Sequence, residues 1–311
     1  MKNSTKHILM VRPASFGFNE ETAKDNAFQH AADPNSKAIS EKALQEFDGF
    51  VKALKDAGVN VIVIHDTPEP RKPDAIFPNN WFTSHADGKL FLYPMKAPLR
   101  RLERRRSIFE LLSQDFQIQE EYDLSHYEQD ERFLEGTGSM IFDRIHKICY
   151  ACISQRTDKG LLEEVCGKLG YEMVAFTAKD GQGKLIYHTN VMLALGTQWA
   201  VICGDSIPDK REREMVMDKL KRSGKEVVDV TIEQMLGFTC NILEATNSKG
   251  ETLLTMSERA YKTFTSEQIK TLEKYAKIVK APLYTIEDIG GGGSRCMMAE
   301  IYFKEKVGNR I

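Results

Sequence analysis

The amino-acid sequence predicts an α/β protein in which five helix-then-strand units close into a radial arrangement. Three observations lead to this fold class. An amphipathic helix followed by an apolar strand recurs five times, and the five helices are spaced by roughly 55 residues. No Pro-rich or Ser-rich linker divides the 311 residues. We therefore expect residues 1–311 to form a single domain.

The first unit shows the pattern most clearly. Apolar side chains recur at helical spacing between residues 39 and 56, which predicts an amphipathic helix. Gly58 ends this helix, and the Val-rich and Ile-rich run over residues 59–64 predicts a strand.

The other four units repeat this order. Their predicted helices cover residues 105–114, 158–169, 212–222 and 266–276. Their predicted strands cover residues 116–118, 173–176, 227–230 and 282–285. Further strand-like runs lie between the units, at residues 89–93, 139–148, 188–195 and 200–203.

A doubly wound nucleotide-binding sheet would also alternate helices and strands. It would place a Gly-rich loop between an early strand and the helix after it. Here the Gly-rich loop over residues 290–293 comes last, precedes a strand-like run and lacks the Lys-Ser/Thr ending of a phosphate loop. We therefore expect no nucleotide and no other cofactor.

Composition and charge exclude several classes of partner. A hydrophobic content of 41% and a net charge of −2 fit an ordinary globular protein that binds neither nucleic acid nor a membrane. The one basic cluster, residues 100–106, could bind an anion, but a solvated face at a helix start is the favoured interpretation. No apolar run approaches the roughly 18 residues that span a membrane.

The cysteines indicate a reduced protein. The chain has 6 of them, scattered too widely for a disulfide framework, which predicts a cytoplasmic location. Cys149 and Cys152 form a C-x-x-C pattern inside a predicted strand. Residues three apart in a strand point to opposite faces, so we expect two packed thiols and no metal site.

The Gly-rich loop delivers a cysteine to the start of an apolar run. The sequence from Gly290 to Gly293 is followed by Ser294, Arg295 and Cys296. Glycines allow close approach of the backbone to a ligand, and a thiol behind such a loop is a candidate nucleophile. The alternative is an inert buried cysteine.

A thiol nucleophile needs a base, and the base needs an orienting acceptor. His188 and Asn190 open an apolar run in which a period of two would place them on one face. Glu135 is a lone carboxylate in an apolar stretch bracketed by glycine. A packed histidine and a solvated strand end are the alternatives for His188 and Glu135.

Two further polar sites are candidates for ligand binding. Asn79 and Asn80 precede an aromatic pair, where they could form a turn or present amide groups to a planar, neutral ligand. Arg156 follows a predicted strand, where it could bind a carboxylate or simply begin a surface helix.

These motifs, in this order, resemble the pentein superfamily of amidinotransferases, arginine deiminases and dimethylarginine dimethylaminohydrolases. Cys296 matches the nucleophile of that superfamily near the C-terminus, and His188 matches its base. Glu135 lies in Leu-Glu-Gly, which matches the family segment Leu-Glu-Gly-Gly-Asp through the acid and the first glycine. The resemblance covers nearly the whole chain and implies a five-bladed α/β propeller, with residues 1–311 as one catalytic domain.

The resemblance also assigns substrate positions. Asp74 would hold the α-amino group of an amino-acid substrate, and Arg156, in the context Ser-Gln-Arg-Thr, would hold its α-carboxylate. The implied partner is a small-molecule amino acid, with no metal and no cofactor. The oligomeric state stays open, a homodimer included.

The departures from the family pattern predict the substrate. Deiminases that act on a cationic guanidinium place aspartates at the positions of Asn80 and Asn190, and the dimethylarginine enzymes have an acid at Asn79. Amides alone would leave a buried guanidinium charge poorly compensated. A neutral ureido group pairs well with amide side chains. We therefore predict a ureido substrate, citrulline first, converted to ornithine, ammonia and carbon dioxide.

The resemblance implies that Cys296 attacks the ureido carbon to form a thiocarbamate-type intermediate, with His188, oriented by Glu135, as acid and then base. Backbone N–H groups around Gly293, Ser294 and Arg295 would stabilise the oxyanion. An arginine dihydrolase or deiminase, or an amidinotransferase with a second amine as acceptor, would apply this chemistry to a guanidino substrate. A non-catalytic binding protein of the same fold is the other alternative.

Overall fold

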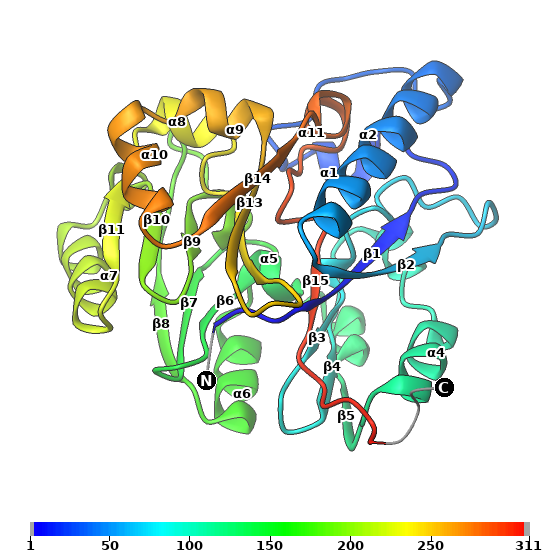
Figure 1. The fold of residues 1–311 in the computed structure, drawn as a ribbon, viewed down its shortest axis with the longest axis horizontal. Coiled ribbons are helices and arrows are strands. Elements are labelled where there is room, and N and C mark those ends of the chain that lie inside the picture. The colour runs from blue at the N-terminus through cyan, green and yellow to red at the C-terminus, as the bar shows by residue number, and fades with distance from the viewer. Residues whose placement is uncertain (1–2, 308–311) are drawn as a thin grey trace.

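The computed structural model describes residues 3–307, which form five three-stranded mixed sheets (Figure 1). In every sheet one outer strand pairs antiparallel with the central strand, and the other outer strand pairs parallel with it. The predicted mixture of helices and strands in five repeated units is therefore confirmed.

The strands follow one another in the same order from sheet to sheet. The second sheet along the chain holds β3 (Phe82–Ser84), β4 (Lys89–Leu92) and β5 (Glu120–Asp123). The next two hold β6 (Ile141–Asp143), β7 (Ile148–Cys152) and β8 (Glu172–Phe176), then β9 (Leu193–Leu195), β10 (Trp199–Ile202) and β11 (Glu226–Asp229). The fifth holds β12 (Leu243–Thr246), β13 (Thr252–Ser257) and β14 (Lys277–Ala281), and the remaining one holds β15 (Ala299–Ile301), β1 (His7–Arg12) and β2 (Asn60–His65).

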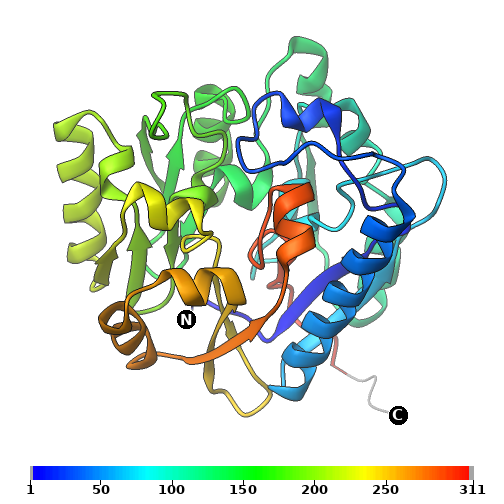
Figure 2. The same ribbon diagram turned by 90° about the horizontal axis from the view of Figure 1, so that it is seen from above.

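A long helix precedes the parallel outer strand of each sheet, because a parallel pair needs a crossover connection. In Figure 2, α2 (blue) and α7 (yellow-green) lie at opposite edges of the molecule. Side-chain caps begin several of these helices, such as Asp158 before α6, which accepts from the backbone N–H of Leu161. The crossover helices are α2 (Lys37–Asp56), α4 (Arg106–Asp115), α6 (Lys159–Leu169), α7 (Lys210–Arg222) and α10 (Ser266–Glu273), close to the predicted bounds.

Short helices and turns fill the connections. The short α-helices are α1 (Glu20–Ala23), α3 (Pro98–Arg101), α5 (Gly136–Ser139), α8 (Ile232–Leu236), α9 (Glu258–Thr263) and α11 (Tyr284–Gly290). Single 3₁₀ turns lie at η1 (Pro78–Asn80), η2 (Ser125–Asp130), η3 (Thr189–Val191) and η4 (Gly204–Ser206).

Two of the strands predicted directly after the repeated helices are wrong. Residues 116–118 make only an isolated bridge, from Phe116 to Glu305, and the strand begins at Glu120. Residues 282–285 lead into α11, and the strand is β14 just before them. Both true strands are partly exposed, and β5 is polar throughout, whereas Phe116 and Leu283, which suggested strands, are buried next to the true elements.

The sheet β15-β1-β2 joins segments far apart in the sequence. Ile8 in β1 pairs with Glu300 in β15, and β2 pairs parallel on the other side of β1. The run of units therefore closes on itself. This pairing also fixes the position of the loop before β15, which carries Cys296.

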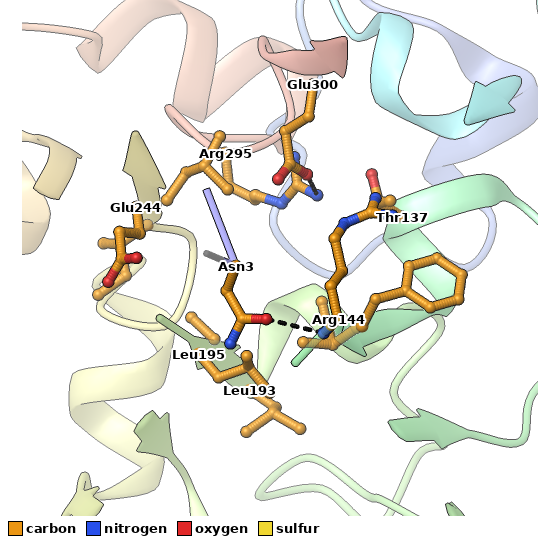
Figure 3. Close-up of a pocket in the computed structure, with 13 residues that line it drawn as sticks. Asn3, Thr137, Arg144, Leu193, Leu195, Glu244, Arg295 and Glu300 are labelled. Carbon is orange, nitrogen blue, oxygen red and sulfur yellow. Dashed lines mark hydrogen bonds and ion pairs between the residues drawn. The ribbon is translucent and has the colours of Figure 1, made fainter. Parts of the chain in front are cut away.

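The first strands of four sheets meet around a small cavity of about 30 Å³ (Figure 3). β6, β9, β12 and β15 all contribute residues to its lining. The guanidinium of Arg295 turns toward this cavity and pairs with Glu300 at 2.8 Å. The side chain next to Cys296 thus points into the interior of the fold.

The two thiols of the C-x-x-C pattern pack into different core clusters. Cys149 lies among the side chains that α6 covers, and Cys152 lies in the cluster that contains Trp199. Both are free and buried, so the predicted opposite-facing arrangement is confirmed. Between residues 3 and 307, no helix has the length and apolar character that crossing a membrane requires.

Candidate active site

Cys296 lies in the turn between α11 and β15 and faces a buried pocket. Its side chain is 8% exposed, and its Sγ accepts hydrogen bonds from Nδ2 of Asn241 at 3.2 Å and Nδ2 of Asn190 at 3.4 Å. Burial raises the pKa of the thiol, while the two amide donors and the charge of Arg295 act in the opposite direction.

Glu135 and His188 form a fully buried acid–imidazole pair. Oε2 of Glu135 lies 2.8 Å from Nε2 of His188, and Oε1 accepts from the backbone N–H of Lys96 at 3.0 Å. Burial alone would raise the pKa of Glu135, but the charge of Arg156 and the hydrogen bond to His188 outweigh it and hold this pKa well below its usual range. Glu135 is therefore ionised at neutral pH.

An ionised Glu135 fixes the tautomer of His188. The carboxylate only accepts, so Nε2 carries the proton and Nδ1 is left as the basic nitrogen. Burial lowers the pKa of His188 despite the neighbouring carboxylate, which keeps the ring neutral. A Cβ on Gly138 would lie 2.7 Å from Nδ1 of His188 and 2.3 Å from Nδ2 of Asn80. Both nitrogen atoms therefore converge above this glycine.

Asn80 is held by a buried arginine that the sequence assigned to a solvated face. That interpretation of Arg100 is wrong: the side chain is 3% exposed, because α3 turns it inward where Glu103 neutralises it at 2.9 Å. Nη1 of Arg100 donates to Oδ1 of Asn80 at 2.8 Å, and Nη2 donates to the carbonyl of Phe77. Burial raises the pKa of Glu103 to about 7 despite the charge of Arg100.

This contact fixes which end of the Asn80 amide faces the pocket. An arginine only donates, so the atom it contacts must be the amide oxygen. Nδ2 of Asn80 is then left buried, with no hydrogen-bond partner among the described residues. Asn80 thus presents a donor to whatever occupies the pocket.

Asn190 presents the opposite polarity. Its Nδ2 donates to Cys296, and its Oδ1 is buried with no partner in the described part of the chain. The predicted strand with a period of two is wrong here, because residues 189–191 form a 3₁₀ turn and the strand begins only at Leu193. The turn nevertheless brings both His188 and Asn190 to the site.

Asn79 does not line this pocket. Its Nδ2 lies 3.4 Å from Oγ1 of Thr137, and the residue is fully buried outside the pocket lining. Successive residues of a tight turn point in different directions, so the structure separates the two asparagines that the sequence grouped.

Asp74 offers a free carboxylate oxygen at the pocket. Oδ2 accepts from Nδ2 of Asn19 at 2.8 Å and from Oγ1 of Thr22 at 3.2 Å, while Oδ1 has no partner between residues 3 and 307. Burial raises the pKa of Asp74, and Arg100 opposes this shift. An ammonium group would satisfy the free oxygen.

Arg156 lies at the pocket but is engaged within the chain. It pairs with Asp25, donates to the carbonyl of Thr22 at 3.2 Å and approaches Glu135 at 3.5 Å. Its guanidinium lies 4.8 Å from the ring centre of Tyr187. A substrate carboxylate would have to share or replace the contact with Asp25.

Gly293 and Ser294 do not face the pocket as expected for an oxyanion site. The N–H of Gly293 donates to Oδ1 of Asn241 at 3.1 Å, and the N–H of Arg295 donates to the carbonyl of Asn241 at 3.2 Å. The hydroxyl of Ser294 donates to the same carbonyl at 2.8 Å. Asn241 therefore occupies the N–H groups of Gly293 and Arg295, and the oxyanion role expected of this loop stays a prediction.

The pocket is nearly closed. It measures about 20 Å³, room for roughly one water molecule. The segment around α1 covers it: Gln29 donates to the carbonyl of Ile289 at 3.1 Å, and Asn26 donates to that of Gly291 at 3.4 Å. In Figure 2 this blue segment lies beside α11 (orange-red). A space of this size cannot hold an amino acid, so side chains around it must move for a substrate to bind.

Asn241 was missed because a single loop asparagine carries no local pattern. A signal does exist in the repeat. One polar residue followed by two apolar residues precedes the first strand of every sheet, at a spacing of roughly 55 residues. These positions are Asn80, Ser139, Asn190, Asn241 and Cys296.

Comparison with known proteins identifies a family. The family model described as N,N dimethylarginine dimethylhydrolase, eukaryotic, matches residues 12–303. No curated protein matches the chain.

Several solved structures share the fold. A variant of the N-terminal domain of ArgZ, bound covalently to a reaction intermediate, has a TM-score of 0.73 and 18% identity over 95% of this chain and 97% of that domain. Apo ArgZ, an arginine dihydrolase from cyanobacteria, has a TM-score of 0.74 and 17% identity over 97% of this chain, which spans 41% of that protein.

A third structure is a dimethylarginine dimethylaminohydrolase variant bound to S-methyl-L-thiocitrulline. It has a TM-score of 0.61 and 14% identity over 95% of this chain and 99% of that chain. The fold similarity extends over 95–97% of this chain, and the family match covers all the residues of the candidate site. The chain belongs to the dimethylarginine dimethylhydrolase family within the pentein superfamily of enzymes.

Proposed function

We propose that this protein hydrolyses the ureido group of citrulline to ornithine, ammonia and carbon dioxide. The observation that carries the proposal is the opposite polarity of two amides beside Cys296. Asn80 offers an unpartnered donor and Asn190 an unpartnered acceptor. A ureido group has a carbonyl oxygen for the first and N–H groups for the second.

A guanidinium fits this pair less well. It carries only donors, so Nδ2 of Asn80 would face another donor. Its charge would also be buried against amides, since Glu135 is already paired with His188 and Arg156. The cost of an uncompensated buried cation favours the neutral substrate.

The ends of the substrate have their own partners in this proposal. The free Oδ1 of Asp74 would accept the α-ammonium group. Arg156 would bind the α-carboxylate as the cover segment rearranges around Asp25.

The reaction balances with one water molecule. The sulfur of Cys296 forms a bond to the ureido carbon, one C–N bond breaks, and the departing amine takes a proton delivered through His188. Water, deprotonated by Nδ1 of His188, then adds to the thiocarbamate carbon and the C–S bond breaks. The carbamate that is released decomposes to an amine and carbon dioxide, and either order of C–N cleavage gives the same products.

The deciding experiment incubates the purified protein separately with citrulline, arginine and N,N-dimethylarginine, with Cys296→Ala as the control. We expect ornithine, ammonia and carbon dioxide from citrulline and no product with the variant. Turnover of arginine without turnover of citrulline would refute the ureido proposal. No turnover of any substrate would favour a binding role.

A second candidate is an arginine dihydrolase. Its support is the fold shared with the arginine dihydrolase ArgZ, together with the free carboxylate of Asp74. An amidinotransferase is the related case, and adding a second amine such as glycine to the arginine reaction separates the two. For all of these functions we propose that the five sheets are the blades of one propeller, and that residues 1–311 act as one catalytic domain.

A further inference from the structure

Asn241, which the sequence did not predict, donates the shorter of two hydrogen bonds to the sulfur of the proposed nucleophile. Its Nδ2 lies 3.2 Å from Sγ of Cys296, compared with 3.4 Å for Nδ2 of Asn190. The side chain is 4% exposed and comes from the turn before β12. Asn241 therefore reaches the site from a sheet that provides none of the predicted residues.

The orientation of the Asn241 amide is fixed by the loop. Its Oδ1 accepts from the N–H of Gly293 at 3.1 Å and from the N–H of Cys296 at 3.4 Å. Backbone N–H groups only donate, so the oxygen must face the loop. The amide nitrogen must then face the sulfur.

The backbone of Asn241 holds the same loop. Its carbonyl accepts from the N–H of Arg295 at 3.2 Å and from the hydroxyl of Ser294 at 2.8 Å. With the two bonds to Oδ1, one residue receives four hydrogen bonds from residues 293–296. The position of Cys296 is therefore tied to Asn241.

Two kinds of group favour the charged form of the sulfur: the amide donors of Asn241 and Asn190, and the positive charges of Arg295 and Arg100. In the part of the chain that the structure describes, the hydrogen bonds to Sγ come from Asn190 and Asn241. Arg295 directs its guanidinium to Glu300. The charged and titratable groups that line the pocket are Asp74, Arg100, Arg156, Tyr187 and His188. A ureido group adds no positive charge beside the sulfur.

We propose that Asn241 is a positioning residue for the Cys296 thiolate: it donates to the sulfur through Nδ2 and holds the loop that aims the sulfur into the pocket. The inference rests on the proposed role of Cys296 as nucleophile. It does not depend on which substrate is attacked.

The test is Asn241→Asp, which keeps an oxygen for both loop N–H groups and replaces the donor by a carboxylate oxygen. Alkylation of Cys296 by iodoacetamide is followed against pH by mass spectrometry, without substrate. The pH midpoint should rise by about one unit or more, because the thiolate loses a donor and gains a neighbouring negative charge. At neutral pH the alkylation rate should fall about tenfold or more.

Ser294→Ala is the matched control. It removes one of the four loop bonds to Asn241 and leaves the donor to Sγ in place, so the midpoint should stay within about 0.3 units. If Asn241→Asp does not fold, Asn241→Ala should show a rise of the same sign, with folding checked by thermal melting. An unchanged midpoint in the folded variant, or an equal shift in Ser294→Ala, would overturn the proposal. Because the assay needs no substrate, a failure to hydrolyse citrulline would not affect it.

Discussion

Asn80→Asp tests how the site discriminates between a ureido group and a guanidinium group. The change replaces the unpartnered Nδ2 by a carboxylate oxygen and keeps the oxygen that accepts from Arg100 at 2.8 Å. Arg100 would hold the new carboxylate in its ionised form. The pocket would then offer an acceptor and a negative charge where it now offers a donor.

The magnitude follows from the lost hydrogen bond. The ureido oxygen gains negative charge as the thiol attacks, and a hydrogen bond to a charged group contributes about 1.5–3 kcal/mol. At about 1.4 kcal/mol per factor of ten, kcat/KM with citrulline should fall by roughly 10-fold to 150-fold. The same carboxylate would compensate a guanidinium, so activity with arginine should fall less or rise.

The assay compares kcat/KM for citrulline and arginine in the wild type, Asn80→Asp and Asn79→Asp. Asn79→Asp makes the same chemical change one residue away, in a side chain that does not line the pocket. It should lower stability without changing the ratio of the two substrates. Equal losses on citrulline and arginine in Asn80→Asp would refute the reasoning.

Three other predictions follow from the contacts. Gly138→Ala should abolish turnover, because its Cβ would lie 2.3 Å from Nδ2 of Asn80 and 2.7 Å from Nδ1 of His188. The control is Gly167→Ala in α6, where no atom lies within 4 Å of the new Cβ. This variant should leave turnover unchanged and raise the free energy of unfolding by about 0.5–1 kcal/mol in urea denaturation. Glu135→Gln should have a lower free energy of unfolding than the wild type at pH 7, and the difference should shrink as the pH falls below about 4.3. The reason is that a carboxylate with a depressed pKa stabilises the folded state only above the pKa that it has in the unfolded chain. A difference that is constant with pH would contradict this. Cys296→Ala should lose turnover and still bind citrulline, seen as a raised melting temperature with added citrulline; no rise would count against the binding assignments.

The sequence predicts the repeated helices well because their signals are local. Each crossover helix has an apolar stripe and a short break after it, and both are legible in a single segment. The strands at the exposed edges are harder to predict. β5 is Glu-Glu-Tyr-Asp, with no apolar pattern, and its pairing with β4 is decided by tertiary contacts.

The site was predicted unevenly for a similar reason. Cys296, His188 and Glu135 stand out as unusual residues in apolar or Gly-rich surroundings. The structure places Cys296 and His188 in the lining of one pocket, and Glu135 is hydrogen-bonded to His188. Their catalytic roles stay predictions. The prediction for Arg100 was wrong because a run of arginines is typical of a solvated helix face. The sequence alone does not show that Glu103 is buried together with Arg100 as an ion pair. Asn241 can be predicted only by aligning the five repeated units, because equivalent positions in different sheets then become visible.

The pairing of β1 with β15 has a consequence for how the protein acquires activity. Ile8 and Glu300 are partners in this pairing, so it closes one of the longest loops that the chain can form. Loop closure of this kind is slow and comes after local structure. The pairing of β15, which directly follows the turn that contains Cys296, is therefore expected to form late in folding. During refolding, the helical circular dichroism signal should recover before enzymatic turnover does. The delay between the two would measure how long β1 and β15 take to pair.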